Sequence, residues 1–285
     1  MAPATNLPVV ASLPRHLTRP RNPDEFAGEY LQTITEAITN QPRSQQVHIG
    51  PSEIGHACSR RIGYKLLGHP EQEKPPNWKA TIGTGAHMWL ETAFDGYNLT
   101  HAPDLDGQER FYIETKVSVG DVNGAEILGS CDLYDRITNT VVDHKTVGPT
   151  QLATYKRKGP SEQYRIQAHL YGRGWQRAGL NVTTVMIAFL PRNGELADAY
   201  IWHEPYNEQV AVDALQRLAG ISLTTNALGA AALPLLPTAD AWCTHCPFFL
   251  ANSDNPERGC PGDPASNVNK PQPTNSTEFL KLDAA

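Results

Sequence analysis

The sequence lacks any long hydrophobic run and any recognisable secretory leader. No window in its 285 residues approaches the ~18 uninterrupted apolar residues of a membrane span. The first residues, MAPATNLPVVASLPRHL, do not place a charged segment before a long apolar one, as a signal peptide does. We therefore expect a cytoplasmic protein with no membrane partner.

An excess of positive charge is also missing, because the formal net charge is −6. A negative balance argues against broad coating of nucleic acid, but it leaves room for a local basic groove. Lysine and arginine do cluster at residues 59–65 (SRRIGYK), 155–159 (YKRKG) and 172–177 (GRGWQR). Each cluster is also explained by an ordinary solvated helix face.

Cysteine is scarce and odd in number, with five residues in the chain. In a chain without a secretory leader, an odd count disfavours a disulfide framework and favours metal binding or buried thiols. The hydrophobic fraction of 40% is enough for a substantial core. The length corresponds to about one to two domains, and we find no internal repeat.

Apolar periodicity changes along the chain and predicts a mixed α/β core with extra helices at both ends. Helical spacing and capping residues predict helices over residues 22–38, 52–68, 80–94, 161–178 and 207–221. Alternating patterns predict strands over residues 110–120, 126–137, 138–147, 182–190 and 197–204, with a tight turn at 138–140. The central order is therefore helix, three strands, helix and strand.

Two aspartates on neighbouring predicted strands are the first candidate site. The segment VVDHKTVG follows GSCDLYD, and a hairpin of these strands would bring Asp132 and Asp143 to one end of the sheet. Two close carboxylates repel each other unless a cation lies between them, and Mg²⁺ or Mn²⁺ suits such oxygen ligands. Lys145 shares a strand face with Asp143, whereas the His144 side chain faces the other way and leaves its backbone carbonyl as a ligand. The alternative is an exposed ion pair between Asp143 and Lys145.

This pattern resembles the PD-(D/E)xK nuclease core in its RecB-like branch, which has the same order of elements. In that branch the helix after the lysine strand carries a Q-x-x-x-Y motif, and QAHLY supplies Gln167 and Tyr171 there. The branch also has a histidine on the helix before the first core strand, and GTGAHMWLE supplies His87. The resemblance implies that Mg²⁺ or Mn²⁺ is bound by His87, Asp132, Asp143 and the backbone carbonyl of His144. It also implies that Lys145 is catalytic and that Gln167 and Tyr171 contact DNA or support the active site.

Each of these motifs has a simpler explanation when it is taken alone. A lone histidine is more often structural, and a Gln–Tyr pair four residues apart is common on helix faces. The joint occurrence of the motifs in the right order is what favours a site. Glu91, one turn beyond His87, and Glu114, on the first strand, are candidate outer residues that would orient a metal ligand. An exposed carboxylate is the alternative for both.

The cysteines form a second pattern. Cys243 and Cys246 are spaced C-x-x-C, Cys260 follows them, and Cys58 lies far upstream. Zinc and iron–sulfur clusters both use four thiolates. Three grouped C-terminal cysteines with one distant cysteine resemble the iron–sulfur nucleases, among them the CRISPR-associated Cas-four family, the AddB-type nuclease domain and related phage exonucleases. The resemblance implies a [4Fe–4S] cluster on these four residues, while zinc and the absence of a metal remain alternatives. We expect Cys131, the fifth cysteine, to be a small buried residue.

The implied organisation is a flexible arm over residues 1–22, a single nuclease domain over 23–263 and a flexible tail over 264–285. Within the domain, Cys58 and the 240–262 segment would form an iron–sulfur clasp. Such a clasp would be structural, because closing a long loop of chain restricts the unfolded ensemble.

Four basic residues are candidates for nucleic-acid binding. The clasp would hold the helix after Cys58 over the entrance of the active site, so that Arg60 and Arg61 grip the DNA backbone. Lys156 and Arg157 are further candidates in the second basic cluster. Solvated side chains without a function are the alternative for all four.

The resemblance implies a metal-dependent DNA exonuclease that acts on single strands or DNA ends, usually in the 5′→3′ direction. Two alternatives are an endonuclease or nickase on the same core and a non-catalytic binding module in a recombination or CRISPR spacer-acquisition complex. The segment PSEIGHACSRRIGYKLLG resembles phage-encoded members, which implies the cytoplasm of a bacterial host. Besides DNA, the expected partners are further copies of the chain or recombination and CRISPR-adaptation proteins.

Overall fold

The computed structural model describes residues 22–40, 49–72, 76–102, 107–239 and 242–265. The chain forms two compact units, residues 1–45 and 46–285, so its first helix is separate from the unit with the predicted sites. That helix, α1 (Pro23–Thr39), begins as the sequence predicts, because the Asn22 side chain accepts a hydrogen bond from the Asp24 N–H. Apart from their inner ends, the expected arm and tail lie outside the described residues.

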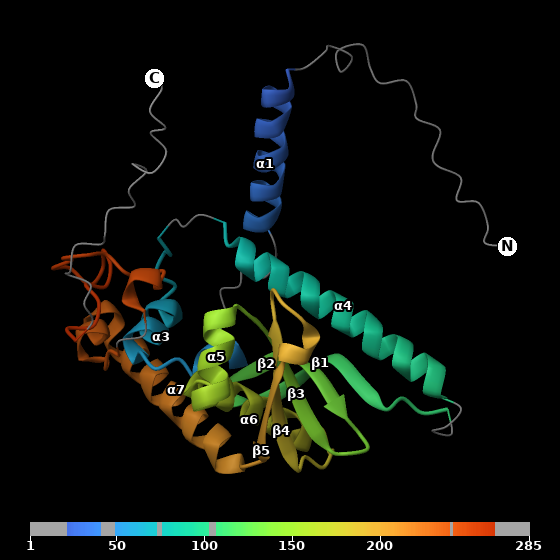
Figure 1. Cartoon of the computed structure of the whole chain (residues 1–285). Helices are drawn as coiled ribbons and strands as arrows, with labels where there is room; N and C mark the ends of the chain where they lie inside the picture. Colours follow the sequence, from blue (N-terminus) through green and yellow to red (C-terminus); the bar gives the residue numbers. More distant parts are fainter. Residues whose placement is uncertain (1–21, 41–48, 73–75, 103–106, 240–241, 266–285) are drawn as a thin grey trace, which may run out of the picture. The chain divides into compact units, whose positions relative to one another are not determined.

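The second unit is built on a five-stranded mixed sheet, which confirms the predicted α/β class. The strands lie side by side in chain order: β1 (Phe111–Val122), β2 (Ala125–Asp135), β3 (Thr140–Val147), β4 (Thr184–Pro191) and β5 (Tyr200–Pro205). Neighbouring strands are antiparallel except β3 and β4, which are parallel. Parallel neighbours need a crossover, and two helices between β3 and β4 provide it (Figure 1).

Six further α-helices and three 3₁₀ segments complete the described part of this unit. The α-helices are α2 (Pro51–Ile54), α3 (Ser59–Leu66), α4 (Trp78–His101), α5 (Pro149–Lys158), α6 (Glu162–Arg177) and α7 (Glu208–Leu228). The 3₁₀ segments are η4 (Leu196–Asp198), η5 (Gly229–Leu235) and η6 (Cys243–His245). The stretch from α7 to Leu235 is long and apolar enough to cross a membrane, but α7 buries Ala214, Leu218 and Ile221 in the core.

Helices cover both faces of the sheet, and each face has its own apolar cluster. The larger cluster joins the strands to α6 and α7 and includes Val117, Val141, Leu170, Ile187 and Leu218. The smaller cluster joins the strands to α4 and contains Phe111, Leu133, Val142 and Ala188, with Phe94 and Tyr97 packed against it. Successive residues of β3 therefore enter opposite clusters. This alternation decides which neighbours the site residues of β3 meet.

The helix predicted over residues 52–68 is wrong in one respect, because the structure divides it into α2 and α3. The break has a tertiary cause, since a Cβ atom on Gly55 would lie 2.9 Å from the Cα of Gln163 on α6. The His56 imidazole also accepts the Cys58 N–H at 3.1 Å, which holds the chain in a turn. Cys58 consequently becomes the N-cap residue of α3 instead of a residue inside a long helix.

Candidate metal sites

The first site lies at a fork between two strands. β2 and β3 pair only from Leu133–Val142 to Asp135–Thr140. Beyond that point the Asp132 carboxylate lies between the strands, and its Oδ2 accepts the His144 backbone N–H at 2.6 Å. A side chain thus takes the place of the next ladder hydrogen bond, and the Asp132 carboxylate is fixed at the end of the β2–β3 pairing.

Two histidines approach Asp132 at this fork. His87, from α4, places Nδ1 3.6 Å from Asp132 Oδ1, and His144 places Nδ1 3.9 Å from Asp132 Oδ2. One ligand atom from each of these three residues lies within 4.8 Å of the other two, a spacing that suits a bound cation. The predicted convergence of His87 and Asp132 is therefore present in the structure.

The side chain of His144 joins this group, which the sequence argument did not anticipate. Its ring points away from Asp143, as strand alternation predicts, and stacks on Phe94 of α4 with the ring centroids 5.9 Å apart. The α4 face is also where His87 lies, 6.0 Å from the His144 ring. The expectation that only the backbone of His144 concerns the metal is therefore corrected: its imidazole is a candidate ligand as well.

The two predicted outer carboxylates differ. Glu114 has a positive φ of 43°, which marks an irregularity in β1, and its Oε1 lies 3.6 Å from His87 Nδ1. A hydrogen bond to Glu114 is the main reason that the pKa of His87 is raised, and the charge of Asp132 adds to it. Glu91 is exposed on α4 and makes no hydrogen bond or ion pair with any residue that the structure describes.

Asp143 and Lys145 point to the α6 side of the sheet. Asp143 is fully buried, and its Oδ2 lies 2.6 Å from Lys145 Nζ. Burial raises the pKa of Asp143 to about 6, and the charge of Asp132 adds to this effect while Lys145 opposes it. Its Oδ1 is buried and has no hydrogen-bond partner among the described residues. A buried carboxylate with an unpartnered oxygen fits a metal ligand better than a simple ion pair.

The Q-x-x-x-Y pair lies on the same side. Gln167 and Tyr171 are both 5% exposed on α6. Gln167 Oε1 has no hydrogen-bond partner within the described residues. Burial raises the pKa of the Tyr171 phenol, and the nearby charge of Asp143 raises it further. Both side chains thus lie on the α6 side of the sheet, the side to which Asp143 and Lys145 point.

Two tyrosines at this site carry no motif, and sequence reasoning missed them. The Nζ of Lys145 lies 4.9 Å from the ring centroid of Tyr164 on α6. Tyr155, on α5, has its ring centroid 6.0 Å from that of Tyr164. The helix that carries Tyr155 was not predicted, because within it only Leu152 is buried and the apolar periodicity is weak. Only the basic cluster after Tyr155 pointed to this part of the chain.

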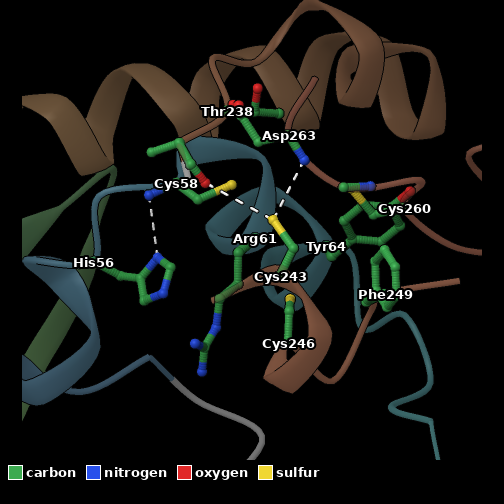
Figure 2. Close-up of a pocket in the computed structure, with 12 residues that line it drawn as sticks. His56, Cys58, Arg61, Tyr64, Thr238, Cys243, Cys246, Phe249, Cys260 and Asp263 are labelled. Atoms are coloured by element: carbon green, nitrogen blue, oxygen red, sulfur yellow. Dashed lines mark hydrogen bonds between the residues drawn. The ribbon is translucent and has the colours of Figure 1, made fainter. Parts of the chain in front are cut away.

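The second site is a pocket lined by four cysteines, as Figure 2 shows. Cys58 precedes α3, Cys243 begins η6, Cys246 directly follows η6, and Cys260 is bridged to Phe249. The four residues predicted to act together do converge. Cys131 is fully buried in the sheet core, as expected, and burial raises the pKa of its thiol.

Backbone N–H groups point at two of the four pocket sulfur atoms. Cys243 Sγ accepts the Asp263 N–H at 3.3 Å, and Cys260 Sγ accepts the Gly262 N–H at 3.4 Å. Burial raises the pKa of Cys246, against the effects of a backbone hydrogen bond and the charge of Arg61. No three of the four sulfur atoms, all in the described part of the chain, lie within 4.8 Å of one another.

Protein contacts join the two segments that bear these cysteines. Tyr64 of α3 stacks on Phe248 with the centroids 5.3 Å apart and donates its hydroxyl hydrogen bond to the Pro256 carbonyl at 2.8 Å. The Arg60 N–H bonds to the Pro237 carbonyl at 3.1 Å. These contacts close the chain between its early and late segments.

The predicted DNA-binding residues fall in two places. Arg60 donates a side-chain hydrogen bond to the Pro234 carbonyl at 3.2 Å, and Arg61 lines the cysteine pocket. Both belong to α3, whose main contacts are with α7 and η5. Lys156 and Arg157 are exposed in the last turn of α5, directly after Tyr155. The ring of that tyrosine lies 6.0 Å from the ring of Tyr164, which is beside Lys145.

No family model matches the chain, and no curated protein matches it. Among solved structures it is similar to a protein named SSO0001, with 16% identity, 78% of this chain and 94% of that chain covered, and a TM-score of 0.44. An alkaline exonuclease of Laribacter hongkongensis is 10% identical over 61% of this chain and 90% of that one, with a TM-score of 0.35. A phage-related exonuclease of Haemophilus somnus is 13% identical over 61% and 91%, with a TM-score of 0.31. Likenesses this distant do not establish a family, so the function has to be argued from the residues of the site.

Proposed function

We propose that the chain is a divalent-metal-dependent deoxyribonuclease built on a PD-(D/E)xK core of the RecB-like type. One observation carries the proposal. At the fork of β2 and β3, His87 lies 3.6 Å from Asp132 and the His144 N–H binds Asp132, while the adjacent residue Asp143 pairs with Lys145 and has a buried oxygen with no partner in the described structure. A structural ion pair would not require a second buried carboxylate and a histidine at the same point.

The donor set fits Mg²⁺ or Mn²⁺. The residues that would hold the ion are His87, Asp132, Asp143 and His144, the last through its carbonyl, its imidazole or both. Such an ion lowers the pKa of a bound water and offsets charge on the scissile phosphate. Glu114 fixes the orientation of the His87 ring through their contact.

Lys145 supplies the cation of the protein itself. Its ammonium group lies at the edge of the fork and is mostly shielded from solvent, with 17% of the side chain exposed. From there it donates a hydrogen bond to a phosphate oxygen or orients the attacking water, which stabilises the transition state electrostatically. Gln167 and Tyr171 hold the α6 side of the site in place.

We infer that the four cysteines bind a structural [4Fe–4S] cluster. The support is chemical: four sulfur donors line one pocket, and backbone N–H groups point at two of the sulfurs. A brown protein absorbing near ~400 nm supports the cluster, whereas a colourless protein with bound zinc contradicts it.

The proposed substrate is single-stranded DNA or a DNA end, attacked as an exonuclease in the 5′→3′ direction. The exposed basic turn at Lys156 and Arg157, close to the tyrosines beside Lys145, is the physical support for a nucleic-acid path. The direction of attack rests on the resemblance of the motifs alone. Cytoplasmic location, a phage origin and partners in recombination or CRISPR adaptation have the same basis.

End-labelled and circular oligonucleotides test this function. The purified protein is incubated with Mg²⁺ or Mn²⁺, and we expect loss of single nucleotides from a labelled linear strand. Cleavage of covalently closed single-stranded circles would show an endonuclease instead. Full activity in an Asp143→Ala, Lys145→Ala double variant would contradict the assigned site. Specific binding without cleavage of either substrate would favour a non-catalytic module.

A further inference from the structure

A cluster of aromatic side chains lies beside Lys145, and the proposed metal binding gives it no role. Lys145 is paired across the sheet with Phe189 of β4, and Tyr155 of α5 stacks on Phe189 with centroids 4.3 Å apart. Tyr164 of α6 completes the cluster, with its ring centroid 4.9 Å from Lys145 Nζ. Three separate elements therefore contribute to one aromatic cluster, and its Tyr164 ring contacts the ammonium group.

The ammonium group has two competing neighbours. Asp143 Oδ2 lies 2.6 Å from Nζ and draws the lysine toward the metal ligands. The face of Tyr164 attracts the same cation through its ring electrons. An Asp143 carboxylate that serves a metal has less negative charge to offer the lysine. A second contact that does not depend on Asp143 then keeps the side chain from swinging into solvent.

Tyr164 is itself held firmly. It stands in the first turn of α6, where its N–H donates to the Ser161 hydroxyl at 3.3 Å. Its ring lies 6.0 Å from the ring of Tyr155, centroid to centroid, and burial raises the pKa of its hydroxyl, with the charge of Asp143 adding to this effect. The ring is therefore a fixed surface beside a flexible four-carbon side chain.

We propose that Tyr164 is the positioning residue for Lys145: its ring holds the ammonium group in the direction of the scissile phosphate while Asp143 serves the metal. This rests on the proposed nuclease function. Because the ring positions the ammonium group, replacing Tyr164 with phenylalanine should lower kcat little, whereas an aliphatic side chain should lower it clearly.

The test uses the full-length protein with saturating Mn²⁺ and a labelled single-stranded oligonucleotide. We expect Tyr164→Leu to lower kcat on the order of 10-fold with KM nearly unchanged, because the contact orients a group that acts in the transition state. Tyr164→Phe should keep most of the activity. Should the leucine variant fail to fold, Tyr164→Met provides the same comparison with a side chain of similar length.

A matched control exists elsewhere in the sheet. Arg136 lies over the ring of Tyr112, with its Cζ 5.2 Å from the centroid, so Tyr112→Leu removes the same kind of contact at a different place. This variant should keep kcat even if it lowers the melting temperature. A general loss of packing would affect both leucine variants alike and would overturn the proposal.

Three further outcomes separate this inference from the proposed nuclease function on which it rests. Full kcat in Tyr164→Leu, together with an inactive Lys145→Ala, overturns the positioning role and leaves the nuclease intact. An equal loss in the phenylalanine and leucine variants also overturns it, because the hydroxyl would then be the active group. Full activity in Lys145→Ala refutes the proposed function itself.

Discussion

The fork site and the cysteine site offer two different ways of holding a metal. The fork residues Asp132 and Asp143 lie on adjacent strands of a buried sheet, and α4 adds His87 from nearby in the sequence. The cysteines come from residue 58 and from residues 243–260, on short helices and irregular segments. The sheet fixes the first geometry, whereas the second depends on packing between distant parts of the chain. Loss of the first metal should therefore stop chemistry, and loss of the second should loosen the fold.

The strongest test of this contrast is Asp143→Asn. We expect activity to fall by roughly 10³-fold or more, because the change removes a charged ligand at the proposed reacting centre. The iron content should not change. Activity is measured on labelled oligonucleotides and iron by elemental analysis.

Asp121→Asn is the matched control, because Asp121 pairs with Arg177 at 3.1 Å on an exposed part of β1. It should retain full activity. Simultaneous loss of activity and iron in Asp143→Asn would show that the two sites are not independent.

Cys243→Ser should have the converse effect. Binding at Cys58 and Cys243 closes a loop of about 185 residues, so losing it should lower the free energy of unfolding by roughly 3–5 kcal/mol, by analogy with a disulfide. The ~400 nm absorption of a cluster should vanish as well. Thermal melting and visible absorption measure the two effects.

The control for this variant is Cys131→Ala, which removes a thiol outside the pocket. It should keep the absorption although it disturbs the core. A Cys243→Ser protein with unchanged colour and unchanged melting temperature would show that no metal joins these segments.

His87→Ala probes the fork more gently. We expect the Mn²⁺ concentration for half-maximal activity to rise about 10–100-fold, a loss typical of weakened metal coordination. Activity titrated against Mn²⁺ gives this value. The control is Glu91→Gln, on the same helix but exposed, which should not change the titration curve. A large shift in that variant would show that Glu91 takes part in metal binding.

Acidic pH should weaken metal binding at the fork in a defined window. The pKa of Asp143 is raised to about 6 from 3.8, so the folded state binds its proton more tightly than the unfolded state. Its contribution to the stability of the metal-free protein is therefore greatest below pH ~4 and is lost as pH rises through about 6. A metal needs the ionised carboxylate, so Mn²⁺ affinity should be about 10-fold lower at pH 5 than at pH 7.5. Calorimetric titration tests this, and Asp143→Asn should flatten the dependence.

The smallest effect is expected at the basic end of α5. Lys156→Gln and Arg157→Gln should each raise KM a few-fold and reduce the salt dependence of binding by about 0.7 per lost phosphate contact on a single strand. Arg177→Gln serves as the control, because that arginine is paired with Asp121. A larger effect from Arg60→Gln than from either α5 variant would move the nucleic-acid path to the cysteine site.

Local patterns predicted much of this fold. Ser161 caps α6 as expected, the five strands lie where alternation placed them, and Asp132 and His87 meet as the motif implied. Helix α5 was missed because its apolar periodicity is weak, and the other failures involve tertiary contacts. The break before Cys58 depends on the close approach of Gly55 to α6. The local sequence does not predict this contact.

The fork shows the same limit at the level of single side chains. Strand alternation placed the ring of His144 correctly on the face opposite Asp143, but it could not say that α4 brings His87 to that face. Tyr164 and Tyr155 escaped notice for a similar reason. Their relation to Lys145 exists only once α5 and α6 fold back over β3 and β4.

Cys58 precedes all five strands in the sequence, and its three partner cysteines follow them. This order has a consequence for biosynthesis. Chains are made from the N-terminus, so every strand and every fork residue leaves the ribosome before Cys243 does. A chain cut short anywhere between residues 178 and 242 would contain the whole proposed catalytic set but only one of the four pocket cysteines. Cluster assembly at this pocket would thus begin only after all five strands have been translated.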